Sequence, residues 1–203
     1  VSNLASVKKM ASSVEKSLGT INILHNNAAT KGDNLESFFA SLENYSLETW
    51  RQIMAVNLDG LFLVAQEIGS KMASNGKGSI IQTSSIYGAT MGPDQRIYKG
   101  SKYMDMPINT PPSYSASKAG VVGVTNYLAT YWADKGVRVN TLTPGGVQSG
   151  QNTIFSENYS ERVPMGRMAD GNEMVGALVF LASDASSYIT GQNIFIDGGL
   201  SAW

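Results

Sequence analysis

Apolar and polar residues follow each other along this chain in two patterns, one typical of amphipathic helices and one typical of buried strands. Apolar residues spaced three and four apart predict helices over residues 3–18, from 47 onward, over 113–134 and over 172–183. Short apolar runs predict buried strands at Ile21–His25, 79–84, 137–143 and 192–197. Because strands and helices alternate, we expect one α/β domain over residues 1–203, a doubly wound parallel sheet with helices on both faces.

Three of the predicted strands are followed by small or polar residues. These segments are Asn26–Ala29, Ser84–Ser85 and Pro144–Val147. In an open parallel sheet, ligands bind beside the carboxyl ends of the strands. We therefore expect the three segments to meet at one edge of the sheet and to form the binding site.

The composition limits the classes of function that the chain can have. Its 203 residues include 15 basic and 16 acidic side chains, and the net charge of -1 offers no basic surface for nucleic acid or anionic lipid. There is no cysteine and only one histidine, His25, which we expect to pack at a strand end. The chain therefore has few side chains that could bind a transition metal. No apolar run is long enough to span a membrane. We expect a cytoplasmic protein that acts on a small molecule.

Tyr114 and Lys118 are four residues apart on one predicted helix, so their side chains share a face. They continue the apolar stripe of Val121 and Leu128, and a lysine that faces the interior is costly unless its charge has a function. Beside a phenol, that charge would lower the pKa of Tyr114 and make it a usable acid or base. The alternative is a packed tyrosine and a surface lysine, because this spacing is common by chance.

Ser85 and Asn57 are two further candidates. Ser85 follows a predicted strand, where its hydroxyl could bind a substrate oxygen or could instead stabilise its own turn. Asn57 lies within the apolar stripe of the helix from residue 47, and a buried amide without partners costs about 1–3 kcal/mol. It could hold a backbone group or a buried water, or it could anchor a proton-relay water near a lysine.

Six segments, taken in order, resemble the short-chain dehydrogenase/reductase family. They are NNAA (26–29), VNLDG (56–60), TSSIYG (83–88), YSASKAG (114–120, with the family's Y-x-x-x-K motif), VRVNTLTPGGV (137–147) and SSYITGQNIFIDGG (186–199). The resemblance implies a Rossmann-like fold and NAD or NADP as cofactor. It also implies that Tyr114 is the acid/base, that Ser85 binds the reacting oxygen and that Asn57 holds a relay water. Lys118 would lower the pKa of Tyr114 and bind the nicotinamide ribose.

The same resemblance implies a set of cofactor-binding residues. Val147 would offer its backbone to the carboxamide, and Ser149 would lie near the pyrophosphate. The rest of the implied set consists of two helix residues, Tyr114 and Lys118, and of four strand-end residues, Asn27, Ala28, Pro144 and Gly145.

The chain departs from the family pattern at its start. The family opens with two strands and a glycine-rich turn that holds the pyrophosphate, and no such turn precedes Ile21. We therefore expect a fragment that lacks the first strands, that leaves Ile21–His25 at an open sheet edge, and that by itself binds either cofactor weakly.

The segment between Ser85 and Tyr114 is longer than the family's usual one. Its polar residues are Asp94, Gln95, Arg96, Tyr98, Lys99 and Lys102. Beside an active site, this insert suits a hydroxyl-rich or acidic substrate, and the alternative is a tolerated surface insertion. With the C-terminal GGLSAW, it weakly resembles members linked to the modification of flagellin or surface glycans.

We therefore expect an NAD(P)-dependent oxidoreductase that interconverts a carbonyl and an alcohol on a small polar, possibly sugar-derived substrate. One alternative is a catalytically inactive, truncated module that serves assembly or binding, and another is a cofactor-independent lyase or hydrolase that reuses Ser85 and Tyr114. Residues such as Phe62, Leu63, Val122 and Tyr127 lie outside the inward stripes of their helices, and the family resemblance implies a homo-tetramer or homo-dimer.

Overall fold

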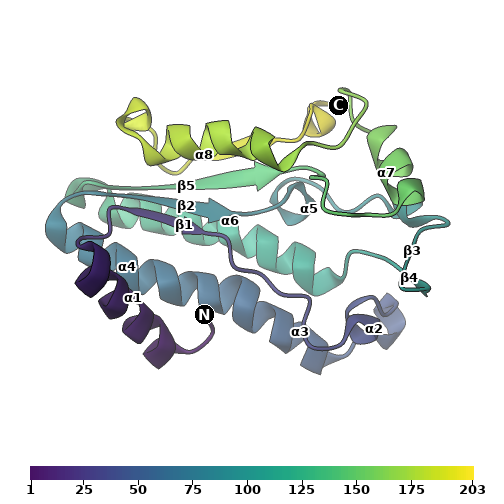
Figure 1. Cartoon of the computed structure of the whole chain (residues 1–203), viewed down its shortest axis with the longest axis horizontal. Helices are drawn as coiled ribbons and strands as arrows, with labels where there is room; N and C mark the ends of the chain where they lie inside the picture. The colour runs from purple at the N-terminus through teal and green to yellow at the C-terminus, as the bar shows by residue number, and fades with distance from the viewer.

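A four-stranded sheet forms the centre of the computed structural model, which describes residues 1–203 (Figure 1). Its strands are β1 (Ile23–Asn26), β2 (Gly78–Thr83), β5 (Val137–Pro144) and β6 (Asn193–Ile196). They lie in the order β1-β2-β5-β6, and every pairing is parallel. The predicted parallel sheet is confirmed, and the carboxyl ends of all four strands lie at one edge.

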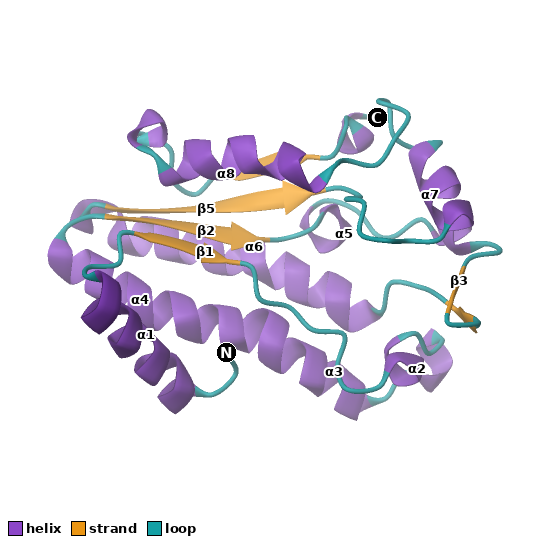
Figure 2. Ribbon diagram, viewed as in Figure 1, coloured by secondary structure: helices purple, strands orange, loops and turns teal.

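Helices cover both faces of this sheet, as the sequence predicts (Figure 2). One face carries α1 (Leu4–Leu18), α4 (Leu61–Asn75) and α6 (Pro112–Trp132), and α8 (Val175–Ala182) packs on the other. The larger core lies under the first face. It includes Val7, Ala11, Ile68, Met72, Ile80, Leu128, Trp132 and Val139. A smaller core of Ile81, Leu142 and Leu181 lies under α8.

The helices of the first face pack closely because one of them carries a glycine at the contact. A Cβ atom at Gly69 would overlap the indole ring of Trp132, so the side-chain hydrogen of glycine lets α4 and α6 approach. Trp132 is 4 % exposed, and its large ring fills the space between the helices and the sheet.

The helix predicted from Leu47 begins where the sequence places it but changes its geometry midway. Ser46 caps α3 (Leu47–Met54) by accepting a hydrogen bond from the backbone N–H of Thr49. A π-helical segment, η2 (Ala55–Gly60), then joins α3 to α4. Such segments are rare and frequently occur at functional sites. This one contains Asn57.

Two apolar patterns are less buried than the sequence predicts. The strand predicted as buried at Ile21–His25 is β1, which starts at Ile23, pairs only with β2 and leaves the Ile23 side chain 53 % exposed. The expected position of β1 at the sheet edge is confirmed. Because no strand covers its outer side, the expected burial of β1 is wrong. In α1, Val7 and Ala11 are buried against α4, whereas Leu18 at the end of the same stripe is 83 % exposed.

Several short elements near the carboxyl edge were not predicted. They are α2 (Leu35–Phe38), η1 (Leu42–Asn44), α5 (Ile86–Ala89), η3 (Gln95–Tyr98), β3 (Lys102–Tyr103), β4 (Met106–Pro107) and α7 (Thr153–Ser160). Strands β3 and β4 form a small antiparallel hairpin within the insert. The rest of the chain adds the 3-10 turns η4 (Ala133–Lys135), η5 (Gly171–Met174), η6 (Asp184–Ser186) and η7 (Leu200–Ala202).

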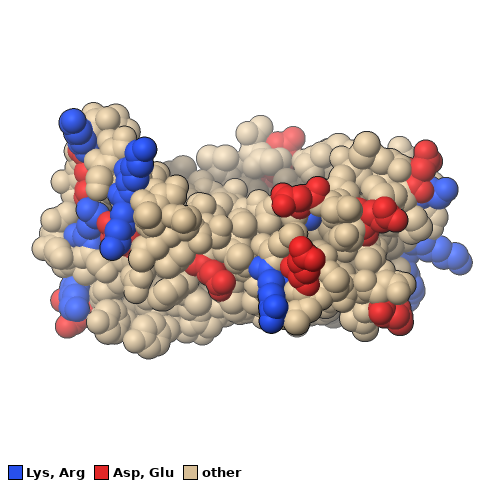
Figure 3. Space-filling view, turned by 90° about the horizontal axis from the view of Figure 1, so that it is seen from below, with Lys and Arg blue, Asp and Glu red and all other residues tan.

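The surface shows no broad field of one charge on the face formed by α1, α3 and α4. Figure 3 shows basic and acidic side chains in small groups, with wide uncharged areas between them. None of the helices has the length and apolar character needed to cross a membrane.

Candidate active site

The predicted site residues lie at the edge where the strands end. A cleft of about 370 Å³ opens there, beside α5, α7 and the insert. Ser85, Tyr114, Gly145, Val147 and Ser149 line it, so two of the three predicted strand-end segments, those after β2 and β5, meet the start of α6 in one place. The third segment, Asn26–Ala29, contributes no residue to this lining.

Ser85 is held in the cleft by its position at the end of β2. Its extended backbone caps α5, and its hydroxyl accepts a hydrogen bond of 3.2 Å from the backbone N–H of Tyr87. The neighbouring Ser84 turns inward and donates to the backbone oxygen of Lys118 at 2.7 Å. The alternation of side chains along the strand therefore selects Ser85, not Ser84, as the residue that faces the cleft.

Tyr114 stands on the first turn of α6, and its side chain lines the same cleft as Ser85. Burial raises the pKa of Tyr114, and the neighbouring Ser85 side chain lowers it in part, so the net shift is upward. The sequence predicts the opposite, a pKa that Lys118 lowers. The expected lowering is not found, because the cost of burying the phenolate is the dominant effect.

Lys118 lies one turn further along α6 and is 5 % exposed. Its Nζ atom donates to the backbone oxygen of Thr83 at 2.9 Å and lies 5.8 Å from the centre of the Tyr114 ring. The predicted proximity of the two residues is confirmed. Burial lowers the pKa of Lys118 to about 8, and no carboxylate counters this effect.

Asn57 is 1 % exposed within the π-helical segment, which packs against α6. Its Oδ1 atom accepts a hydrogen bond of 2.9 Å from the backbone N–H of Thr30 and so fixes the loop that follows β1. Its Nδ2 atom has no hydrogen-bond partner. Asn57 therefore holds a backbone group, and it also keeps a buried donor available for a further ligand.

The predicted cofactor residues occupy the ends of β1 and β5. Asn27 and Ala28 are exposed in the loop after β1, and Pro144 is the last residue of β5. The backbone N–H of Gly145 donates to Ile196, and a Cβ atom at Gly145 would lie only 2.8 Å from Asp197, so a glycine is needed there. The adjacent residues Val147 and Ser149 face the cleft.

The donors at this edge fit a nicotinamide cofactor. The ammonium of Lys118 makes one of its three possible hydrogen bonds, and the backbone N–H of Val147 makes none within the chain. These free donors suit the ribose hydroxyls and the carboxamide oxygen, as the sequence resemblance implies.

The insert closes one side of the cleft. Asn109 donates through Nδ2 to the backbone oxygens of Phe39 and Ala40, at 2.8 and 3.2 Å, and the rings of Tyr103 and Phe39 are 6.3 Å apart. These contacts join the insert to the segment after α2. The insert therefore borders the cleft, and its part in substrate choice stays a prediction.

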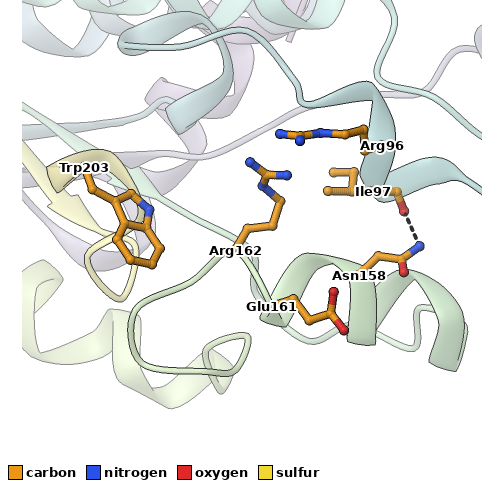
Figure 4. A pocket seen from close by; sticks show the side chains of 6 residues that line it. All are labelled: Arg96, Ile97, Asn158, Glu161, Arg162 and Trp203. Atoms are coloured by element: carbon orange, nitrogen blue, oxygen red, sulfur yellow. Dashed lines mark hydrogen bonds between the residues drawn. The ribbon is translucent and has the colours of Figure 1, made fainter.

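Of the polar insert residues predicted to lie beside the site, only Tyr98 lines the cleft, and the others lie outside it. One of the others, Arg96, lines a second hollow of about 460 Å³. Its lining consists of Arg96, Ile97, Asn158, Glu161, Arg162 and Trp203. Figure 4 shows the guanidinium groups of Arg96 and Arg162 close together, and both pair with Asp94.

Two further residues that line the cleft and matter to its chemistry were not predicted. Lys31 lies in the loop after β1, and Tyr103 lies on the insert hairpin. A signal for Lys31 was present, because it follows the predicted binding segment Asn26–Ala29 at the carboxyl end of a strand. Tyr103 carried no signal, because its position depends on the fold of the insert.

Two family models match the chain, and together they cover it almost completely. Residues 1–104 match the model described as short chain dehydrogenase. Residues 104–201 match the model described as Enoyl-(Acyl carrier protein) reductase.

Individual relatives agree with these matches. D-threitol dehydrogenase of Mycolicibacterium smegmatis is 36% identical over 204 residues, which cover 98% of this chain and 70% of that protein. A short chain dehydrogenase from Leptospira borgpetersenii with bound NAD+ has a TM-score of 0.84 at 35% identity, covering 98% of this chain and 72% of that one. A gluconate 5-dehydrogenase from Burkholderia cenocepacia, in complex with NADP and tartrate, has a TM-score of 0.81 at 31% identity, covering 100% and 73%.

Proposed function

The chain belongs to the short-chain dehydrogenase/reductase family, and on that premise we propose that it is an NAD(P)-dependent oxidoreductase. The reaction interconverts a carbonyl and an alcohol on a small polar, sugar-derived substrate. The observation that carries the proposal is that Ser85 and Tyr114 line the same cleft, with the buried ammonium of Lys118 beside the tyrosine ring.

The cofactor supplies or accepts the hydride, and the protein handles the proton. In the reducing direction, the Tyr114 hydroxyl donates its proton to the substrate oxygen. The Ser85 hydroxyl donates a hydrogen bond to the same oxygen and so positions the carbonyl. Because burial raises the pKa of Tyr114, the residue is protonated at neutral pH and ready to act as the acid.

Lys118 and Asn57 support this proton transfer. When Tyr114 has lost its proton, the nearby ammonium stabilises the phenolate electrostatically, and its two free N–H groups are available to ribose hydroxyls. The unpaired Nδ2 atom of Asn57 holds a water molecule through which the proton is restored. On the cofactor side, the Val147 N–H would hold the carboxamide and Ser149 would hold the pyrophosphate, as the sequence resemblance implies. Asn27, Ala28, Pro144 and Gly145 would complete that binding site.

A sugar-derived substrate suits the lining of the cleft. Amide and hydroxyl side chains from the insert and from the loop after β5 line the same cleft as Ser85 and Tyr114. Among them are Asn109, Ser149, Gln151 and Asn152. Two of the relatives are named for polyhydroxylated substrates, D-threitol and gluconate. The second family model is described by a reductase of acyl groups. We favour the sugar class because two of the relatives are named for such substrates and three amide side chains, Asn109, Gln151 and Asn152, line the cleft among its apolar residues.

We also propose that the protein works in the cytoplasm as a homo-tetramer or homo-dimer. Two exposed apolar surfaces support assembly. The outer sides of α4 and α6 expose Phe62 and Tyr127, at 42% and 65%, and α8 exposes Val175 and Val179, at 48% and 59%. Such patches on separate faces are typical of surfaces between subunits.

The test measures cofactor binding and turnover separately. Titration of the purified protein with NADH and with NADPH gives the affinities, and oxidation of polyols in the presence of NAD+ or NADP+ gives the rates. We expect Tyr114→Phe to lose turnover by at least about a hundredfold, because general acid–base catalysis contributes that much, and to bind the cofactor normally.

The same experiment separates the oxidoreductase from the inactive-module alternative. Unchanged turnover in Tyr114→Phe would remove the tyrosine from the mechanism. A wild-type protein that binds a cofactor but oxidises no sugar-derived alcohol would favour the module.

A further inference from the structure

The candidate active-site cleft contains a single charged side chain. Of the 23 residues that line it, Lys31 alone carries a charge at neutral pH, and no aspartate or glutamate is among them. The Lys31 ammonium also takes no part in any ion pair of the protein. The Lys118 ammonium is buried beside Tyr114 and does not line the cleft, so Lys31 is the one positive charge in the cleft wall.

Contacts on both sides hold Lys31 at the cleft. The Lys31 Nζ atom lies 5.5 Å from the centre of the Tyr103 ring, which belongs to the insert hairpin. Its backbone follows Thr30, whose N–H donates to the buried Oδ1 atom of Asn57. A cation over an aromatic face is attracted to the ring, so the lysine is directed across the cleft mouth towards the insert.

The charge pattern selects among sugar-derived substrates. A neutral polyol needs only the amides and hydroxyls that line the cleft, and gains little from an ammonium. A carboxylate gains a charge-assisted hydrogen bond, which is about twice as strong as one between neutral groups. One positive charge balances a singly charged carboxylate, whereas a phosphate monoester carries about −1.5 to −2 at neutral pH and would be only partly neutralised.

We propose that Lys31 is a specificity residue that binds the carboxylate of an acidic sugar, an aldonate, while Tyr114 and Ser85 act on a hydroxyl of the same molecule. This inference rests on the proposed oxidoreductase function and names its substrate class. The insert takes part because Tyr103 holds the ammonium in place.

The test compares substrates that differ in one group only. The holoenzyme is assayed with aldonates of four to six carbons and with the polyols that carry CH2OH in place of the carboxylate. We expect kcat/KM to be at least about tenfold higher for the preferred aldonate, since hydrogen bonds to charged groups contribute more than about 1.4 kcal/mol. Lys31→Met should remove most of this preference, mainly through KM, and Lys31→Arg should restore it in part.

The control is Lys102→Met, which removes the same charge from an exposed residue of the hairpin that does not line the cleft. It should leave the preference unchanged. The inference is overturned if polyols are preferred, if Lys31→Met lowers kcat/KM equally for both members of a pair, or if Lys102→Met has the same effect as Lys31→Met. A preference for sugar phosphates over aldonates would also overturn it.

A binding measurement separates this inference from the proposed function. Calorimetric titration with an aldonate and with its polyol needs no turnover. If neither is oxidised but the aldonate binds and Lys31→Met abolishes that binding, the proposed function fails and the carboxylate site stands. If polyols are oxidised and Lys31→Met changes nothing, the proposed function stands and the carboxylate site fails.

Discussion

Lys118 lies buried beside Tyr114 with one hydrogen bond and no carboxylate near it, so its positive charge is held in the fold at a cost. Replacing it with methionine keeps much of the side-chain volume and removes the charge. We expect Lys118→Met to make the protein more stable at neutral pH and, at the same time, to lose oxidoreductase activity. Active sites commonly show this trade-off between stability and function.

The magnitude follows from the pKa of the buried amine. Burial lowers the pKa of Lys118 from 10.5 to about 8, and each pKa unit corresponds to about 1.4 kcal/mol, so the charged form costs ~3 kcal/mol at neutral pH. Methionine removes this cost but leaves the Thr83 carbonyl without its donor, which costs about 1–2 kcal/mol. The expected net stabilisation is therefore about 1–2 kcal/mol.

The pH dependence has a definite sign. Between about pH 8 and pH 10.5, the unfolded protein keeps the Lys118 proton and the folded protein has lost it, so wild-type stability rises with pH across this window. Above the window both states are neutral and the cost has disappeared. The advantage of Lys118→Met over the wild type should therefore be greatest below pH 8 and should shrink, or reverse, by pH 10.5.

Urea unfolding of both proteins at several pH values measures this difference, because shared titrations, including those of the tyrosines, cancel to first order in the comparison. Lys9→Met, on the exposed side of α1, is the matched control, and its stability difference should not change across the window. A constant difference between Lys118→Met and the wild type would show that the lysine keeps its ordinary pKa, and the reasoning would be refuted.

Three further predictions test other parts of the structure. Asn57→Ala leaves the Thr30 N–H without its acceptor and should lower the free energy of unfolding by about 1–3 kcal/mol in urea titrations. Gly69→Ala forces a methyl group into the Trp132 ring and should cost about 1–3 kcal/mol, with a lower melting temperature in calorimetry, whereas Gly76→Ala would report only backbone strain. If α4 and α6 pair between subunits, Tyr127→Glu should reduce the mass measured by light scattering; an unchanged mass would exclude that surface.

The repeating patterns in the sequence predict the fold well, because strands and helices bury one side each. The four strands of the sheet and the helices over 47–75 and 112–132 lie close to their predicted positions. Burial is predicted less well, because a pattern shows which side of an element is apolar and not what covers it. In β1, the apolar Ile23 is on an edge with no strand beyond it.

The candidate site residues are predictable where a polar residue occupies a position that the apolar pattern assigns to the interior. Asn57 interrupts an apolar stripe and Lys118 lies on an inward face, and both are buried as expected. The pKa of Tyr114 is not predictable in this way, because its sign depends on the balance between desolvation and a charge at a distance that the sequence does not give. Lys31 is an ordinary polar residue in a polar loop, and its significance comes from the absence of other charges around the cleft.

The π-helical segment at Ala55–Gly60 changes the direction in which side chains point around one continuous helix. A π turn holds about one residue more than an α turn, and one residue corresponds to about 100° of rotation around an α-helix. The apolar sides of α3 and α4 can therefore both face the core, although in an unbroken α-helix they would point in different directions. The turn between them places the amide of Asn57. Loss of a single residue from this segment would force one apolar side to rotate away from the core or Asn57 to leave it. The segment is thus less tolerant of length change than of side-chain change.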